Sequence, residues 1–261
     1  MKRDILRQAV NVVAVLAVIV VNGLANALPL NGQTTGEISD RFQVYFVPAG
    51  YVFSIWGVIY LGLLAFAVYQ ALPTQRENPR LRRVGYLFAA SCVANIAWLF
   101  LWHYEQFVLT LVAMFTLLLL LITIYLRLEI GRVVVSPAEK WLVRLPFSIY
   151  LGWISVATIA NVTSVLDYLG WSGWGISDEV WALIMLLVAG ALAAIVSLTR
   201  GDVAYSLVFM WALVGIAVKN AGTPLVVVTA WVVTAFVGVM LVVGVLLNRG
   251  RSQLPVSPAD A

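Results

Sequence analysis

Tryptophan, tyrosine and asparagine side chains recur at helical spacing in two apolar stretches of this chain. Residues spaced i, i+3, i+7 and i+11 lie on one face of a helix. The two faces hold, respectively, Asn95, Trp98 and Trp102, and Tyr150, Trp153, Ala157 and Asn161. Flat aromatic rings with a few amides suit the binding of a large planar apolar molecule. Because no catalytic triad, carboxylate pair or metal-ligand set accompanies them, the pattern indicates binding and not catalysis.

Two further stretches carry side chains of the same kind. Trp56 lies in residues 48–60, and Asn22 and Asn26 lie near the end of the first apolar stretch. An amide in hydrocarbon costs free energy unless it finds a partner, so it faces the interior of a helix bundle. We therefore expect four helices to bring an indole or an amide to the same depth.

Simpler interpretations of these residues stay open. Intramembrane asparagines commonly form hydrogen bonds between helices. Tryptophans at the ends of spans commonly anchor a helix in the membrane interface, and Trp56, Trp98 and Trp153 lie deeper than an anchor requires. We expect the interfacial role for Trp102, Trp141, Trp171 and Trp174.

The elements that position these side chains are predicted to be membrane-spanning helices. The chain is 62% hydrophobic and 11% charged, whereas soluble domains carry roughly 25% charged residues. The apolar stretches are long and show no strand-like alternation, which favours helices over a β-barrel. We predict an all-α integral membrane protein with eight transmembrane helices, the first of them retained. Their approximate bounds are 5–27, 50–72, 84–103, 107–127, 141–166, 179–198, 203–218 and 225–247.

The basic residues fall on one side of the predicted membrane. Of the 16 lysines and arginines, all but Arg41 and Lys219 lie in segments that share a side with the N-terminus. The positive-inside rule then makes both termini cytoplasmic, and we expect a bacterial plasma (inner) membrane. No ionisable side chain lies near the middle of a predicted span, which argues against a proton relay, an ion pump or a voltage sensor. Nucleic acid is not an expected partner, because the basic residues form no single patch.

Three motifs, in order along the chain, resemble those of the TspO/translocator protein family, also called tryptophan-rich sensory proteins or peripheral-type benzodiazepine receptors. The resemblance rests on PAGYVFSIWGVIY at 48–60, NIAWLF at 95–100 and LPFSIYLGW at 145–153, followed by Ala157 and Asn161. These are similar to the family patterns P-P-x-W-x-F-x-x-V-W-x-x-L-Y, L-N-x-x-W-S-x-x-F and P-Y-x-x-W-x-x-x-A-x-x-L-N. The resemblance covers about residues 1–166.

The resemblance implies a five-helix bundle whose ligand pocket is covered by the loop between the first two spans. Family ligands include porphyrins and haem-type tetrapyrroles, sterols in eukaryotes, and benzodiazepine-like synthetic compounds. We therefore expect a tetrapyrrole-like ligand, no required cofactor and no metal site. His103 could ligate the metal of a haem or chlorin, although a lone histidine at a span end is more commonly a hydrogen-bonding residue. The candidate ligand-binding residues are Asn26, Pro48, Phe53, Trp56, Asn95, Trp98, Tyr150, Trp153, Ala157 and Asn161.

The sequence also departs from the family pattern. Ala49 replaces the second proline of the span-two motif, and Leu99 replaces the serine after the span-three tryptophan. The sterol-recognition pattern Tyr-x-Arg is missing at the end of the fifth span, where residues 167–170 read DYLG, so cholesterol is not expected. Beyond a TspO-like five-helix bundle at 1–166, we predict an additional three-helix transmembrane segment at 167–248 and a disordered cytoplasmic tail at 249–261.

Three functions remain compatible with these observations. The first is a membrane sensor or carrier that binds a hydrophobic planar ligand in an aromatic pocket in the outer half of the bilayer, with membrane lipids around it. The second is a non-catalytic accessory or structural subunit of a larger membrane complex, in contact with a membrane-protein partner or a second copy of the chain. The third is an enzyme that degrades porphyrins through a photoexcited tryptophan. We expect no enzymatic activity, since the sequence offers no catalytic set.

Overall fold

The computed structural model describes residues 2–28 and 30–249, without the side chain of Asn26. Within these ranges the protein is helical and has no strand. Six segments are long and apolar enough to cross a membrane, and Leu87–His103 and Val203–Lys219 are shorter apolar helices. The expectation of an all-helical membrane protein is confirmed in this form. The apolar helices are α1 (Lys2–Ala27), α3 (Ile55–Ala71), α5 (Leu87–His103), α6 (Phe107–Arg127), α8 (Leu145–Tyr168), α9 (Asp178–Arg200), α10 (Val203–Lys219) and α11 (Pro224–Arg249).

Short helical turns connect these helices. Several begin where the sequence offers a proline at the first helical position or a side-chain cap, as at Asn78, whose Oδ1 accepts from the backbone N–H of Arg80. These short elements are η1 (Leu30–Gly32), α2 (Thr35–Ser39), η2 (Gly50–Ser54), η3 (Pro73–Gln75), α4 (Pro79–Val84), α7 (Pro137–Glu139), the π-helical η4 (Lys140–Arg144) and η5 (Gly173–Gly175).

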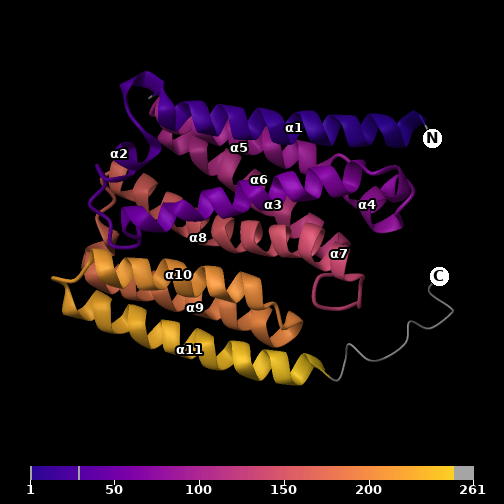
Figure 1. The fold of residues 1–261 in the computed structure, drawn as a ribbon. Coiled ribbons are helices and arrows are strands. Elements are labelled where there is room, and N and C mark those ends of the chain that lie inside the picture. The colour runs from indigo at the N-terminus through magenta and orange to yellow at the C-terminus, as the bar shows by residue number, and fades with distance from the viewer. Residues whose placement is uncertain (1, 29, 250–261) are drawn as a thin grey trace.

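The long helices run antiparallel to their neighbours in the chain (Figure 1). The start of α1 and the end of α11 lie at one end of the molecule, which we call the terminal end. The opposite end, which carries α2, we call the α2 end. α1 packs on α3 and α5, α6 packs on α5 and α8, and α10 packs on α8. α9 and α11 pack on each other and on α10, and α8 and α10 form the main contact between the first five apolar helices and the last three.

Close backbone approach brings α10 against η2. The backbone N–H of Ala49 donates to the Gly215 carbonyl at 3.1 Å, and Trp211 Nε1 donates to the Val52 carbonyl at 3.1 Å. A Cβ added at Gly215 would lie 2.2 Å from Val52 Cγ2. Glycine is required here because a side chain would push η2 away from α10.

A buried carboxylate links α10 to two other helices near the terminal end. Asp202 is 7% exposed and caps α10, since its Oδ1 accepts from the backbone N–H of Tyr205. Its Oδ2 accepts from the Tyr125 hydroxyl at 2.8 Å and from the Ser148 hydroxyl at 2.6 Å. A buried carboxylate needs such donors to offset its lost hydration. Asp202 therefore ties α6, α8 and α10 together.

Several boundaries differ from the sequence prediction. The expected loop between the first two spans contains α2, and the expected charged turn after the second span contains α4. η4 precedes α8, so regular helix begins at Leu145 and not at Trp141. Trp102 was expected to be an interfacial anchor, and this is wrong, because it is 4% exposed and donates from Nε1 to the Thr35 carbonyl. The predicted tail at 249–261 lies outside the described residues, except for Arg249, which ends α11.

Candidate functional site

Trp56 stands at the start of α3, just after η2, and is surrounded by aromatic rings. Its ring stacks on Tyr60 at a centroid distance of 5.4 Å and contacts Tyr150 and Trp153 edge to face at 6.1 and 6.2 Å. Phe53 contacts Trp153 edge to face at 5.7 Å. Such arrangements are favourable for aromatic pairs. The rings of η2, α3 and α8 thus form a continuous aromatic wall near the α2 end.

One amide chain joins α1, α5 and α8. Asn22 Nδ2 donates to Asn95 Oδ1 at 2.9 Å, and Asn95 Nδ2 donates to the Tyr150 hydroxyl at 3.2 Å. Asn95 and Tyr150 are 1% and 2% exposed. These are interhelical hydrogen bonds of the kind that buried amides form in membrane proteins. They fix the depth at which the three helices meet.

A second chain joins α5, α8 and α6. Trp98 Nε1 donates to Asn161 Oδ1 at 3.1 Å, and Asn161 Nδ2 donates to the Thr110 hydroxyl at 2.9 Å. Trp98 also stacks on Trp102 at a centroid distance of 5.4 Å. Asn161 therefore fixes the orientation of the Trp98 indole, in agreement with the supporting role that the family resemblance implies for it.

Trp153 differs from these residues, because its polar atom is left without a partner. The side chain is 3% exposed, and its Nε1 is buried with no hydrogen-bond acceptor among the described residues. A buried unpaired N–H costs on the order of 1–3 kcal/mol. A bound molecule with an acceptor at this position would remove that cost.

These side chains line a cavity of about 70 Å³ between η2, α3, α5, α6 and α8. From the predicted set it is lined by Pro48, Phe53, Trp56, Asn95, Trp98, Trp153, Ala157 and Asn161. Tyr150 is not part of the lining and lies behind it, in contact with Trp56 and Asn95. Asn26 lies in α1, and its side chain is outside the described part of the chain.

A second cavity, of about 370 Å³, adjoins the first between α1, α3 and α5. Phe53, Trp56 and Trp98 belong to the linings of both, so these rings form the partition between them. Asn22 and Tyr60 line only the second cavity, and Met114 and Leu117 only the first.

The segment after α1 covers both cavities at the α2 end. Thr35 lines both, and Ser39 and Val47 line the first. The segment is fixed by a capping box, in which the Thr34 hydroxyl accepts from the Glu37 backbone and Glu37 accepts from the Thr34 backbone. These hydrogen bonds lower the pKa of Glu37. The packing of Phe42 against Trp102 and Phe107 secures the other end of the segment.

Comparison with family models identifies this architecture. The model described as TSPO-like protein matches residues 8–243. The chain belongs to the family of TSPO-like proteins. No match was found among curated proteins or among solved structures. The matched range extends past residue 166 and includes α9, α10 and most of α11.

In this TSPO-like chain, sequence reasoning missed part of the cavity lining. Trp102 lines the cavity, although its position near a helix end suggested an anchor. The signal was present, because Trp102 follows Trp98 at i+4 on the same helical face. Met114, Leu117 and Ser164 carry no such signal, since apolar or small residues at helical spacing occur on every packed face.

His103 does not reach the cavity of the TSPO-like site. It is 1% exposed, its Nδ1 lies 2.9 Å from the Leu99 carbonyl, and its Nε2 lies 3.5 Å from the Thr35 hydroxyl. In the neutral ring, Nδ1–H donates to the carbonyl and Nε2 accepts from the hydroxyl. Both ring nitrogens are therefore engaged, Nδ1 with the backbone of its own helix α5 and Nε2 with Thr35 of the covering segment.

Proposed function

We propose that this TSPO-like protein is a membrane sensor or carrier that binds a planar hydrophobic molecule of the tetrapyrrole type between η2, α3, α5, α6 and α8. The observation that carries the proposal is the buried Trp153 Nε1–H without an acceptor, in the wall of an aromatic cavity. Tetrapyrroles combine a flat apolar ring system with polar groups that accept hydrogen bonds. The indoles would stack on the ring, and Trp153 would donate to a polar group of the ligand.

The proposal includes a topology. All eight apolar helices cross the membrane, with both termini in the cytoplasm of a bacterial cell. The asymmetry of lysine and arginine supports this orientation, and the location of the start of α1 and the end of α11 at the same end of the molecule agrees with an even number of crossings (Figure 1). The α2 end then faces outward, and the cavity lies in the outer half of the bilayer.

A tetrapyrrole needs more space than the smaller cavity offers. Pockets for drug-sized ligands begin at roughly 300 Å³, and the cavity beside Trp153 holds about 70 Å³. The adjoining cavity of about 370 Å³ is separated from it only by side chains. We infer that Trp56, which unlike Trp98 is not oriented by a hydrogen bond to Asn161, rotates on binding, so that the ligand occupies both spaces.

The lining supplies indoles, amides and hydroxyls, which serve to bind and stack a ligand. The same site would therefore support porphyrin breakdown only if light drove the reaction. Neither a cofactor nor a metal is part of the proposal. A role as an accessory subunit is the alternative outcome. It would be supported if the purified protein held no pigment, bound no porphyrin and retained another membrane protein.

The test is a titration of protoporphyrin IX into full-length protein in lipid nanodiscs, followed by absorption and tryptophan fluorescence. Trp153→Phe keeps an aromatic ring and removes the Nε1–H. We expect this variant to weaken binding about two- to tenfold, the range for one hydrogen bond of roughly 0.5–1.5 kcal/mol.

The matched control is Trp141→Phe, since Trp141 is 61% exposed and lies in η4, away from the cavity. It should bind like the parent protein. Equal affinities for the Trp153→Phe variant and the parent would place the ligand elsewhere and contradict the proposal.

A further inference from the structure

A cavity of about 150 Å³ lies on the other side of α8 from the site described above. It is bounded by residues 43–46, the end of α8, the tryptophan-rich connection that contains η5, and the start of α9. It shares no lining residue with the two cavities around Trp56. Any molecule in it would contact both α8 and α9, which belong to the two groups of helices that meet at α8 and α10.

Tryptophan rings form one wall of this cavity in a fixed arrangement. Trp171 and Trp181 line it, with ring centroids 4.9 Å apart. Trp181 Nε1 donates to the Gly173 carbonyl at 2.9 Å, which ties α9 to η5. Gly173 has φ +62°, and a Cβ there would lie 3.0 Å from Trp181 Nε1. Glycine thus allows the connection to lie against the indole.

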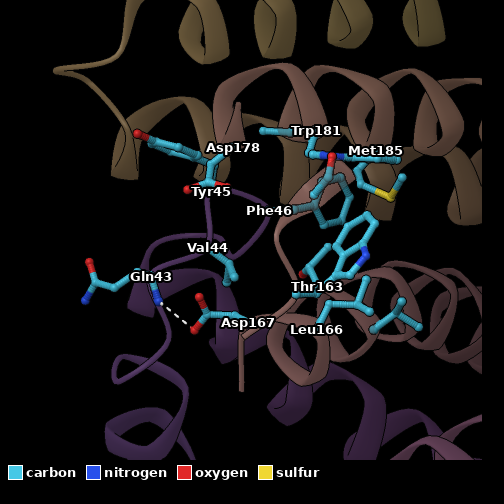
Figure 2. Close-up of a pocket in the computed structure, with 14 residues that line it drawn as sticks. Gln43, Val44, Tyr45, Phe46, Thr163, Leu166, Asp167, Asp178, Trp181 and Met185 are labelled. Atoms are coloured by element: carbon cyan, nitrogen blue, oxygen red, sulfur yellow. Dashed lines mark hydrogen bonds between the residues drawn. The ribbon is translucent and has the colours of Figure 1, made fainter. Parts of the chain in front are cut away.

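Two carboxylates also line this cavity. Figure 2 shows Asp167 and Asp178 on one side of the cavity, with Val44 between them in that view, and Phe46, Met185 and Leu166 on the other side. Asp167 Oδ2 accepts from the backbone N–H of Gln43 at 3.3 Å. Both aspartates are exposed residues, so they line the open side of the cavity.

Basic side chains are absent from the part of the cavity lining that the structure describes. The neighbouring carboxylate of Glu179 accepts from the Tyr45 hydroxyl at 3.3 Å. The nearest basic residue along α10, Lys219, pairs with Asp40 at 3.2 Å. The space is therefore negative on one side and apolar and aromatic on the other.

We propose that this cavity is a second binding site, and that it takes a small organic cation, a protonated or quaternary amine attached to one apolar ring. The ammonium group lies on the side of the cavity that Asp167 and Asp178 line. Indole faces attract such a cation in addition to the carboxylates. The volume suits a body of one ring, because an engineered apolar cavity of about 150 Å³ takes up benzene.

A phospholipid offers the same ammonium chemistry but fits less well. Its phosphate lies next to the ammonium and would be repelled by the same carboxylates. The occupant we assign is therefore a free amine, and a lipid headgroup is an outcome that the test distinguishes.

The experiment is equilibrium dialysis of radiolabelled phenethylamine against the full-length protein in phosphatidylglycerol nanodiscs, with empty nanodiscs subtracted. We expect saturable binding that phenethyl alcohol, its neutral analogue, does not displace. The double variant Asp167→Asn, Asp178→Asn should bind about tenfold more weakly, since it keeps the shape of both side chains and removes both charges.

The matched control is Glu105→Gln, which removes an exposed carboxylate at the same end of the molecule but outside the cavity. It should leave amine binding unchanged. The double variant should still bind protoporphyrin IX, so that failure of this proposal and failure of the proposed function are separate results. Unchanged amine binding in the double variant, or displacement by phenethyl alcohol, would overturn the assignment. Competition by added phosphatidylethanolamine would overturn the assignment of a free amine and identify a lipid headgroup as the occupant.

Discussion

At the scale of single residues, the site is built from amides that hold indoles in place. Asn161 accepts from Trp98 and donates to Thr110, and Asn95 joins Asn22 to Tyr150. Both asparagines thus form interhelical hydrogen bonds while they also line a cavity. Such a residue can be both structural and ligand-binding, because one side chain can bond a neighbouring helix and also face the cavity.

Protonation of Glu37 at acid pH should loosen the segment that covers the cavity. The folded pKa of this carboxyl is lowered by the hydrogen bonds from Thr34. A lowered pKa means that the contribution of Glu37 is fully present above the ordinary carboxyl pKa and is lost as pH falls through the folded value. Hydrogen exchange of the α2 amides, corrected for intrinsic rates, should therefore accelerate below about pH 4.

Glu37→Gln separates this effect from the other carboxylates of the segment. Glutamine still completes a capping box but does not titrate in this range. Its α2 amides should keep the same protection at pH 3 and pH 7. Equal acid sensitivity in the variant would assign the effect to the Asp40–Lys219 or Arg41–Glu105 pairs.

At the scale of elements, the contact between η2 and α10 positions one wall of the cavity. Pro48 and Phe53 flank the segment that Gly215 and Trp211 hold through Ala49 and Val52. Gly215→Ala should destabilise the protein by about 1–3 kcal/mol, the usual cost of inserting a methyl group into a packed contact. It should also weaken porphyrin binding, because η2 has to shift.

Gly238→Ala is the control for that substitution. It adds the same methyl group on α11, where the nearest atom, Met210 Cε, would lie 3.5 Å from it. Unfolding in a detergent titration should be unchanged for Gly238→Ala. If Gly215→Ala unfolds at the same detergent concentration as the parent protein, the contact between η2 and α10 contributes nothing to stability.

The elements themselves were largely predictable, and their partners were not. Long apolar runs predict the helices, whereas their direction across the membrane, inferred from the positive charges, stays a prediction. Periodicity placed Asn95 with Trp98, but it does not say which helix is adjacent, so the bonds to Asn22 and Asn161 could not be derived. The burial of Trp102 depends on the covering segment, whose conformation is set by the capping box and by the packing of Phe42.

At the scale of the whole molecule, α8 is the central helix. Its candidate span, Pro137–Tyr168, is 61% buried, against 28% to 39% for the other five long spans. The expected division into a five-helix bundle at 1–166 and a three-helix segment at 167–248 stays a prediction. The contacts described above nevertheless make one packed body of the first five apolar helices and α10.

Deletion of residues 170–261 tests whether the first five apolar helices depend on α10 for their stability. The truncated chain would lose Gly215, Trp211 and Asp202, and with them the bonds to η2, Tyr125 and Ser148. We expect lower thermal stability and loss of protoporphyrin binding. Deletion of 250–261 alone, beyond the end of α11, should change neither. A folded truncated protein with unchanged affinity would show that the last three helices are an independent addition.

The seam between α8 and α10 also has a consequence for how the protein is made. Ser148 and Ser155 lie on α8, and their partners Asp202 and Tyr205 follow about fifty residues later in the chain. While the ribosome synthesises that interval, the hydroxyls of α8 have no permanent acceptor or donor across the seam. Ser155 can meanwhile donate to the Leu151 carbonyl of its own helix, whereas the bonds from Ser148 to Asp202 and from Tyr205 to Ser155 require α10. The hydrogen bonds that fix α8 against its neighbour are therefore completed only after α10 has been synthesised.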